Sequence, residues 1–130
     1  MIVLEYQKAN LHPSIINLTT MKEKSLPRIK GSLIPIGPTT SHEWVGVHYS
    51  STQPKDIVKF KLGDLEEETL QSLTYVWERT TIKSNDLVVA QDFEWNAKDG
   101  VKIHGWLYRP KTPSKKAIIY VHGGPTYHLE

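Results

Sequence analysis

Two glycines and a proline follow an apolar run near the C-terminal end of the sequence. Ala117–Val121 reads AIIYV, and His122-Gly123-Gly124-Pro125 come directly after it. Glycine reaches backbone conformations closed to other residues, and it lets a substrate approach the main chain closely. A backbone N–H freed at such a turn can donate to an oxygen that becomes negative during acyl transfer. The pattern therefore favours an oxyanion-binding turn.

Such a turn must be positioned by the elements before it. A continuous apolar run such as Ala117–Val121 predicts a strand covered on both faces, and a strand of this kind delivers its carboxyl end to the active-site edge of an open α/β sheet. The preceding segment, DFEWNAKDGVKIHGWLYRP, predicts a hairpin. Phe93 to Trp95 lead in, 97–100 form the turn, and Val101 to Tyr108 lead out, because Asp-Gly between alternating segments is a strong hairpin signal.

Further upstream, short apolar runs alternate with turn-forming residues. This spacing predicts short strands in antiparallel sheets, with the prolines falling mostly between strands, where a missing N–H costs little. The runs are Ile2-Val3-Leu4, Ile15-Ile16, Leu33-Ile34-Pro35-Ile36, Trp44-Val45-Gly46-Val47 and Ile57-Val58-Lys59-Phe60.

A faint repeat links two of these stretches, VLEYQKANLHPSIINL and VGVHYSSTQPKDIVKF. Each has a strand with a tyrosine, a polar turn, a proline and a second strand. The separation of Pro13 and Pro54 is close to one four-stranded propeller blade, roughly 40 residues. Two unrelated hairpins would give the same pattern. The two stretches are therefore either copies of a propeller-blade repeat or two hairpins that are similar by chance.

The segment DLEEETLQSLTYVW is ambiguous. Asp64 could cap a helix with acidic residues in its first turn, or a loop could lead into a strand over Leu73 to Trp77. We favour a short helix or turn over Leu65 to Gln71.

Composition excludes several classes of function. The 130 residues suffice for one small domain, and the absence of cysteine excludes disulfides and thiolate metal sites. A net charge of +2 argues against nucleic-acid and anionic-membrane partners. There is neither a signal peptide nor a membrane-length apolar run, so we expect a cytoplasmic protein. We interpret the densest basic group, Lys22, Lys24, Arg28 and Lys30, as a solvated face.

We expect neither a cofactor nor a metal ion. His42 and His48, with Glu43 beside one of them, are the nearest approach to a metal-binding set. No third ligand has suitable spacing.

The combination DGVKIHGWLYRP…KKAIIYVHGGPT resembles the start of the catalytic domain of the prolyl oligopeptidase family, especially its acylaminoacyl-peptidase-like branch. In that family a β-propeller precedes an α/β-hydrolase domain. The resemblance covers Trp44 to Thr126 and is specific from Asp99 onward. It implies a mainly β chain of antiparallel strands from partial propeller blades, followed by the first hairpin and strand of the hydrolase domain. Residues 1–86 would end the propeller-like region, 87–128 would start the hydrolase domain, and 129–130 would suit a cloning scar.

The resemblance also implies an activity, serine-dependent hydrolysis of peptide or acyl-amino-acid bonds, with peptides or acyl-peptides as substrates. Gly124 would donate the oxyanion N–H, while His122, Gly123 and Pro125 would support the loop. One departure is decisive: no serine has glycines at both flanking positions of G-x-S-x-G. The catalytic serine, acid and histidine would lie downstream, so we expect these 130 residues to be inactive alone.

Two alternatives remain. The chain could be a self-standing β module that binds a partner without catalysis, although such a module has no evident use for the glycine turn. It could also start a lipase- or esterase-type hydrolase without a propeller. As a fragment, the chain should self-associate, most simply as a two-fold dimer that exchanges the segment Phe93 to Val121 or pairs edge strands. That segment could instead fold back on its own chain.

Overall fold

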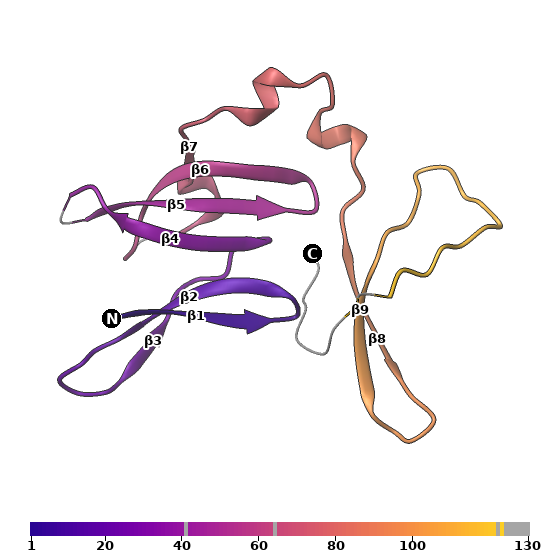
Figure 1. Cartoon of the computed structure of the whole chain (residues 1–130), viewed down its shortest axis with the longest axis horizontal. Helices are drawn as coiled ribbons and strands as arrows, with labels where there is room; N and C mark the ends of the chain where they lie inside the picture. The colour runs from indigo at the N-terminus through magenta and orange to yellow at the C-terminus, as the bar shows by residue number, and fades with distance from the viewer. Residues whose placement is uncertain (41, 64, 122, 124–130) are drawn as a thin grey trace.

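The computed structural model describes residues 1–40, 42–63, 65–121 and 123, and it is mainly β, which confirms the predicted class. Within this part of the chain, three antiparallel sheets each join strands that are neighbours in sequence (Figure 1). The first sheet contains β1 (Ile2–Gln7), β2 (Asn10–Ile16) and β3 (Glu23–Ser25); the second contains β4 (Ser32–Pro38), β5 (Glu43–Ser50), β6 (Gln53–Lys61) and β7 (Gln71–Ser72); the third is the hairpin β8 (Gln91–Asn96) and β9 (Lys102–Leu107).

The helical residues that the structure describes lie in three 3-10 turns, η1 (Glu67–Thr69), η2 (Val76–Arg79) and η3 (Ser84–Asp86), between β6 and β8. No described helix has the length and apolar character needed to cross a membrane.

The two members of the sequence repeat form hairpins, β1–β2 and β5–β6. The expectation that their prolines separate the strands is wrong, because Pro13 lies inside β2 and Pro54 inside β6. Neither proline faces a third strand: β3 begins to pair at Ser14, and β7 pairs only with Val58 and Lys59. A missing backbone N–H therefore breaks no ladder bond on that side.

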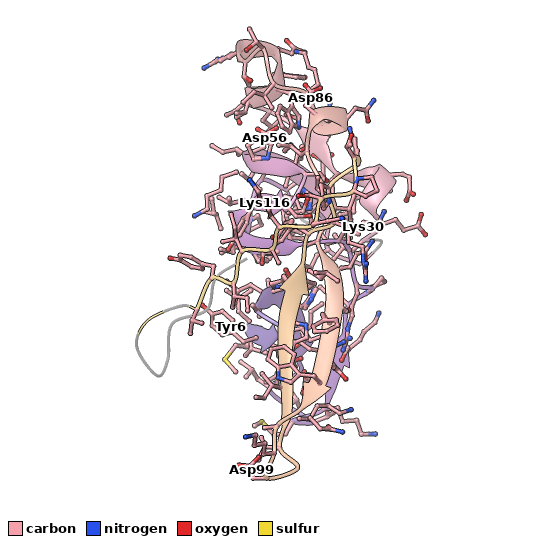
Figure 2. All side chains as sticks on the ribbon, turned by 90° about the vertical axis from the view of Figure 1, so that its right-hand side faces the viewer. Tyr6, Lys30, Asp56, Asp86, Asp99 and Lys116 are labelled. Atoms are coloured by element: carbon pink, nitrogen blue, oxygen red, sulfur yellow. The ribbon has the colours of Figure 1, made fainter. Side chains whose placement is uncertain are left out.

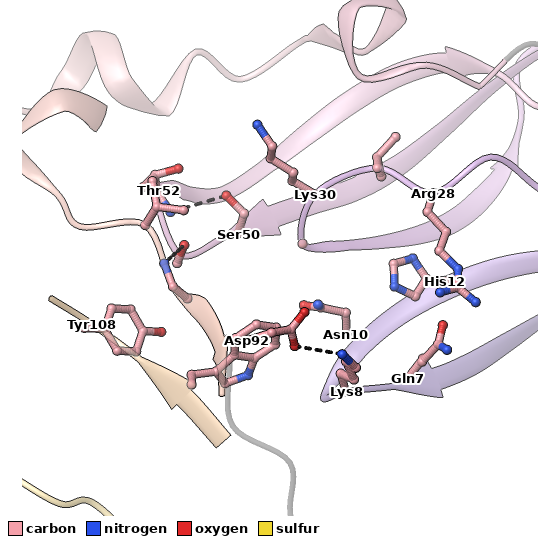
Figure 3. Close-up of a pocket in the computed structure, with 16 residues that line it drawn as sticks. Gln7, Lys8, Asn10, His12, Arg28, Lys30, Ser50, Thr52, Asp92 and Tyr108 are labelled. Carbon is pink, nitrogen blue, oxygen red and sulfur yellow. Dashed lines mark hydrogen bonds and ion pairs between the residues drawn. The ribbon is translucent and has the colours of Figure 1, made fainter. Parts of the chain in front are cut away.

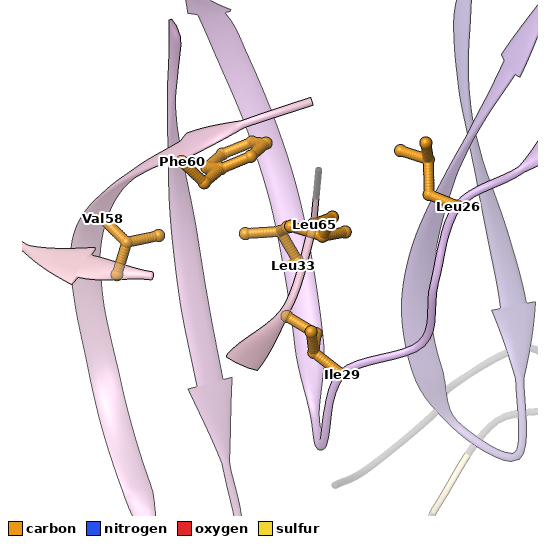
Figure 4. Close-up of a cluster of buried hydrophobic side chains, with 6 residues drawn as sticks. All are labelled: Leu26, Ile29, Leu33, Val58, Phe60 and Leu65. Atoms are coloured by element: carbon orange, nitrogen blue, oxygen red, sulfur yellow. The ribbon is translucent and has the colours of Figure 1, made fainter. Parts of the chain in front are cut away.

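The hydrophobic core lies against the second sheet and the loop that leads into it (Figure 4). Leu33 on β4 and Leu65 after β6 are 0% exposed. A buried hydrogen bond connects the first two sheets, because Leu11 N on β2 donates to Ser32 Oγ on β4 at 2.8 Å. The complete cluster is Leu26, Ile29, Leu33, Val58, Phe60 and Leu65.

The turn into β4 depends on Gly31, which has a positive φ of 77°. A Cβ built at this position would lie 2.1 Å from the carbonyl oxygen of Tyr49 on β5. The neighbouring Lys30 carbonyl accepts a hydrogen bond from His48 Nε2 at 3.0 Å. The loop before β4 is thus fixed closely against β5.

A buried carboxylate connects β6 to the segment around β7. Asp56 is 4% exposed, and its oxygens accept hydrogen bonds from the Ser72 and Thr74 hydroxyls. Burial alone would raise the pKa of Asp56, but these bonds outweigh it and lower the pKa. The folded protein therefore holds Asp56 in its ionised form.

The ambiguous segment contains η1, so a short turn inside the predicted range Leu65 to Gln71 is confirmed, although the predicted end is wrong because Gln71 begins β7. Asp64, its proposed cap, lies outside the described residues. The alternative strand over Leu73 to Trp77 is wrong. Tyr75 has a left-handed conformation, with φ 50°, and the chain turns into η2 at this point.

The predicted hairpin is confirmed in β8–β9, where Phe93 faces Gly105 and Gly100 has a φ of 84° in the turn. The prediction of a strand over Ala117–Val121 is wrong. This segment forms no strand, and residues 118–121 are between 81% and 96% exposed. Among the described residues no strand lies beside it, and a strand without a neighbour leaves its backbone groups unpaired.

Candidate functional site

The glycine turn falls largely outside the part of the chain that the structure describes. His122, Gly124 and Pro125 lie outside it, so their assigned roles stay predictions. Gly123 is described; it is exposed, and a Cβ added there would meet no described atom within 4 Å. The position thus has space for a side chain.

A different candidate site is a cavity of about 460 Å³ where the three sheets meet (Figure 3). This volume is typical of small-molecule sites. Its walls are the turn between β1 and β2, the loop before β4, the turn between β5 and β6, and the hairpin β8–β9. The residues that matter for its chemistry are Lys8, His12, Arg28, Lys30, Asp92 and Trp106.

One wall carries two cations that form no salt bridge in the described chain, although the Arg28 charge opposes the rise in the pKa of Glu5 that the neighbouring Glu23 causes. Arg28 and Lys30 are exposed and line the cavity, while Ile29 between them is 6% exposed and belongs to the core. Neither cation forms an ion pair with any carboxylate in the described ranges. The solvated-face interpretation of this basic group therefore misses that two of its members line a concavity.

His12 lies next to the Arg28 guanidinium in the same wall (Figure 3). Burial lowers the pKa of His12, and the positive charge of Arg28 lowers it further. The imidazole is therefore neutral at pH 7, with one ring nitrogen able to donate and the other able to accept.

The opposite wall contains an acid whose charge is already compensated. Asp92 Oδ1 lies 2.8 Å from His104 Nε2 and 3.3 Å from Lys8 Nζ. The contact with His104 lowers the pKa of Asp92 most, and Lys8 adds to the effect. Lys8 also contacts Glu94, at 3.5 Å. These ion pairs connect the hairpin β8–β9 to the turn between β1 and β2, and they leave the cavity with excess positive charge.

Trp106 contributes a hydrogen-bond donor without an acceptor. Its Nε1 atom is buried, and it has no hydrogen-bond partner among the described residues. The indole packs edge-on against His104, with ring centroids 5.0 Å apart. Buried polar groups are nearly always hydrogen-bonded, so this N–H is an exception inside the wall of the cavity, with no surface open to the cavity itself.

The structure does not bring the histidines of the suggested metal-binding set together as ligands. His48 Nε2 donates to the Lys30 carbonyl, and His42 is exposed in the loop before β5. In the described ranges no group of three histidine, aspartate or glutamate side chains could hold a metal ion.

Sequence reasoning missed the cavity because its walls come from four separate segments. One local signal is present in the sequence: the glycine Gly31 marks a turn, and Arg28 and Lys30 come just before it. Nothing in the sequence indicated that Trp106 would be opposite.

Neither a family model nor a curated protein matches this sequence.

Proposed function

We propose that this chain is part of a serine peptidase of the prolyl oligopeptidase family, where it joins a propeller-like region to the start of an α/β-hydrolase domain. Gly124 donates the oxyanion N–H, and His122, Gly123 and Pro125 support its loop. The nucleophile, acid and base come from sequence beyond these residues. The cysteine-free composition supports a cytoplasmic location.

The observation that carries the proposal is the order of elements before the glycine turn. The Asp-Gly hairpin β8–β9 is followed by the apolar segment 117–121, which is exposed and unpaired. Four apolar side chains in this state require a covering surface. A hydrolase sheet on both sides of the segment would provide one. The sequential four-stranded order β4-β5-β6-β7 also suits a propeller blade.

Labelling with a fluorophosphonate probe tests the proposal. We expect no covalent product with the purified 130-residue chain, because it contains no activated serine. In cells that produce the protein, we expect a labelled polypeptide whose tryptic peptides include these residues and a G-x-S-x-G segment. Labelling of a serine in the purified chain would contradict the proposal, as would finding these peptides only in unlabelled polypeptides.

Replacing the oxyanion donor should reduce catalysis more than binding. In the polypeptide that carries the complete catalytic set, we expect Gly124→Val to lower kcat about a hundredfold or more with little change in KM, because the N–H acts mainly on the charged intermediate. The matched control is Gly63→Ala, in the loop after β6, where an added Cβ meets no described atom within 4 Å. A folded Gly124→Val enzyme with unchanged kcat would place the donor elsewhere.

The isolated chain should self-associate through its exposed apolar segment, most simply as a dimer. We expect sedimentation equilibrium to show a concentration-dependent mass. Ile118→Asp should shift the equilibrium toward monomer, because it places a charge in the segment. Ile82→Asp is the control, since Ile82 is exposed in a separate loop. A monomer at every concentration would contradict this expectation.

A second candidate is a β module that binds a ligand without catalysis. One observation favours it, the cationic cavity between the three sheets. This cavity could serve a ligand under either function.

A further inference from the structure

We propose that the cavity between the three sheets binds the carboxylate of a small organic acid of tripeptide size, with Arg28 as the principal contact. The inference is independent of the proposed peptidase activity, because it uses only described residues and no part of the glycine turn.

The distribution of charge supports an anionic ligand. Asp92 is the carboxylate that lines the cavity, and it is occupied by Lys8 and His104. Arg28 and Lys30 form no ion pair within 4 Å in the described chain, although the Arg28 charge also acts on the Glu5 carboxylate, so Asp92 is not the acid that neutralises them. An entering anion would contact these cations without first displacing an ion pair.

The cationic loop is held in place before any ligand arrives. Ile29 anchors it in the core, and Gly31 brings it against the Tyr49 carbonyl. The hydrogen bond from His48 to the Lys30 carbonyl fixes the backbone between them. A loop that is already ordered loses little conformational entropy on binding, which favours affinity.

A carboxylate suits this site better than a doubly charged phosphate. The planar guanidinium of Arg28 can form two parallel hydrogen bonds with a carboxylate, as it can with a phosphate, so the preference depends on the charge of the neighbouring groups. The adjacent His12 is neutral at pH 7, so it contributes hydrogen bonding without a further positive charge.

The remainder of the ligand would meet neutral polar groups. Ser50 and Thr52 line the cavity, and the side chain of Trp106 forms part of its wall. A volume of about 460 Å³ is large enough for a short peptide acid.

Titration calorimetry of the 130-residue chain with three probes at pH 7 tests the proposal. The probes are N-acetyl-triglycine, its C-terminal amide and inorganic phosphate. We expect the acid to bind at least about tenfold more tightly than the amide, as loss of a charge-assisted contact predicts. Phosphate should bind more weakly than the acid. In NMR spectra the acid should shift the Trp106 indole N–H signal.

Two substitutions of Arg28 test whether this residue binds the carboxylate of the acid. Arg28→Gln should weaken binding of the acid at least about tenfold, and Arg28→Lys should weaken it less, because it keeps the charge and loses the planar fork. Lys24→Gln is the matched control, since Lys24 is an exposed cation on β3 outside the cavity. Urea unfolding of each variant establishes that the fold is intact.

Four results would overturn the proposal. They are no binding of the acid, equal binding of acid and amide, tighter binding of phosphate, and unchanged binding by a folded Arg28→Gln variant. Fluorophosphonate labelling is unaffected by any of them, so failure of this site and failure of the peptidase proposal are distinguishable.

Discussion

Gly31→Ala is expected to destabilise the protein by at least about 3 kcal/mol, a large part of the stability of a small domain. The added Cβ would lie 2.1 Å from the Tyr49 carbonyl oxygen and 2.6 Å from Ser50 Cβ. The strand β5 must move to relieve this overlap. A positive φ of 77° adds about 1–2 kcal/mol of strain for any residue with a side chain. Urea unfolding followed by tryptophan fluorescence measures the loss.

Gly37→Ala, on the strand that Gly31 leads into, provides the control. Gly37 is near the other end of β4, and a Cβ there meets no described atom within 4 Å. Its free energy of unfolding should stay within about 0.5 kcal/mol of the wild-type value, as for most surface substitutions. If Gly31→Ala matched this control, the close approach of the loop to β5 would be wrong.

Asp56→Ala is expected to cost about 3 kcal/mol of stability. The substitution removes two hydrogen bonds to a buried charge, each worth about 1.5–3 kcal/mol. It also leaves the Ser72 and Thr74 hydroxyls without their acceptor. Asp99→Ala is the control, because Asp99 lies exposed in the β8–β9 turn, far from Asp56 (Figure 2). A loss equal to that of Asp99→Ala would contradict the role of Asp56 in connecting β6 to the segment around β7.

The same carboxylate gives the stability a defined pH dependence. Since the pKa of Asp56 is lower in the folded state than in the unfolded state, the unfolded chain takes up the proton first as pH falls. The contribution is complete above the unfolded value of about 4 and disappears as pH falls through the folded pKa. Asp56→Asn should therefore flatten the acid side of the stability curve.

Local signals predicted the elements of this fold well where each is stabilised by near neighbours. The Asp-Gly turn fixes β8–β9 because Gly100 provides the positive φ that the turn requires. The alternating residues Asp56, Val58 and Phe60 place one face of β6 in the interior. In both cases the pattern depends on residues close in sequence.

Predictions failed where structure depends on distant or external partners. The run Ala117–Val121 has the composition of a buried strand, but composition does not supply the neighbouring strands that would pair with it. The cavity could not be predicted from the sequence. Arg28 and Trp106 are far apart in the chain, and they line the same cavity only because separate sheets pack together. A short sequence pattern does not predict which distant residues will line one cavity.

The contact between the β8–β9 hairpin and the first sheet should depend on the salt concentration of the buffer. Its described side-chain contacts with the first sheet are the ion pairs of Lys8 with Asp92 and Glu94, while Phe93 and Trp95 are exposed on the other face. Dissolved ions weaken exposed charge pairs once the Debye length falls to a few ångströms, but they leave apolar burial intact. We therefore expect concentrated salt to weaken the contact between the hairpin and the first sheet, while the hydrogen bond from Ala90 N to Ser51 Oγ and the core around Leu33 remain.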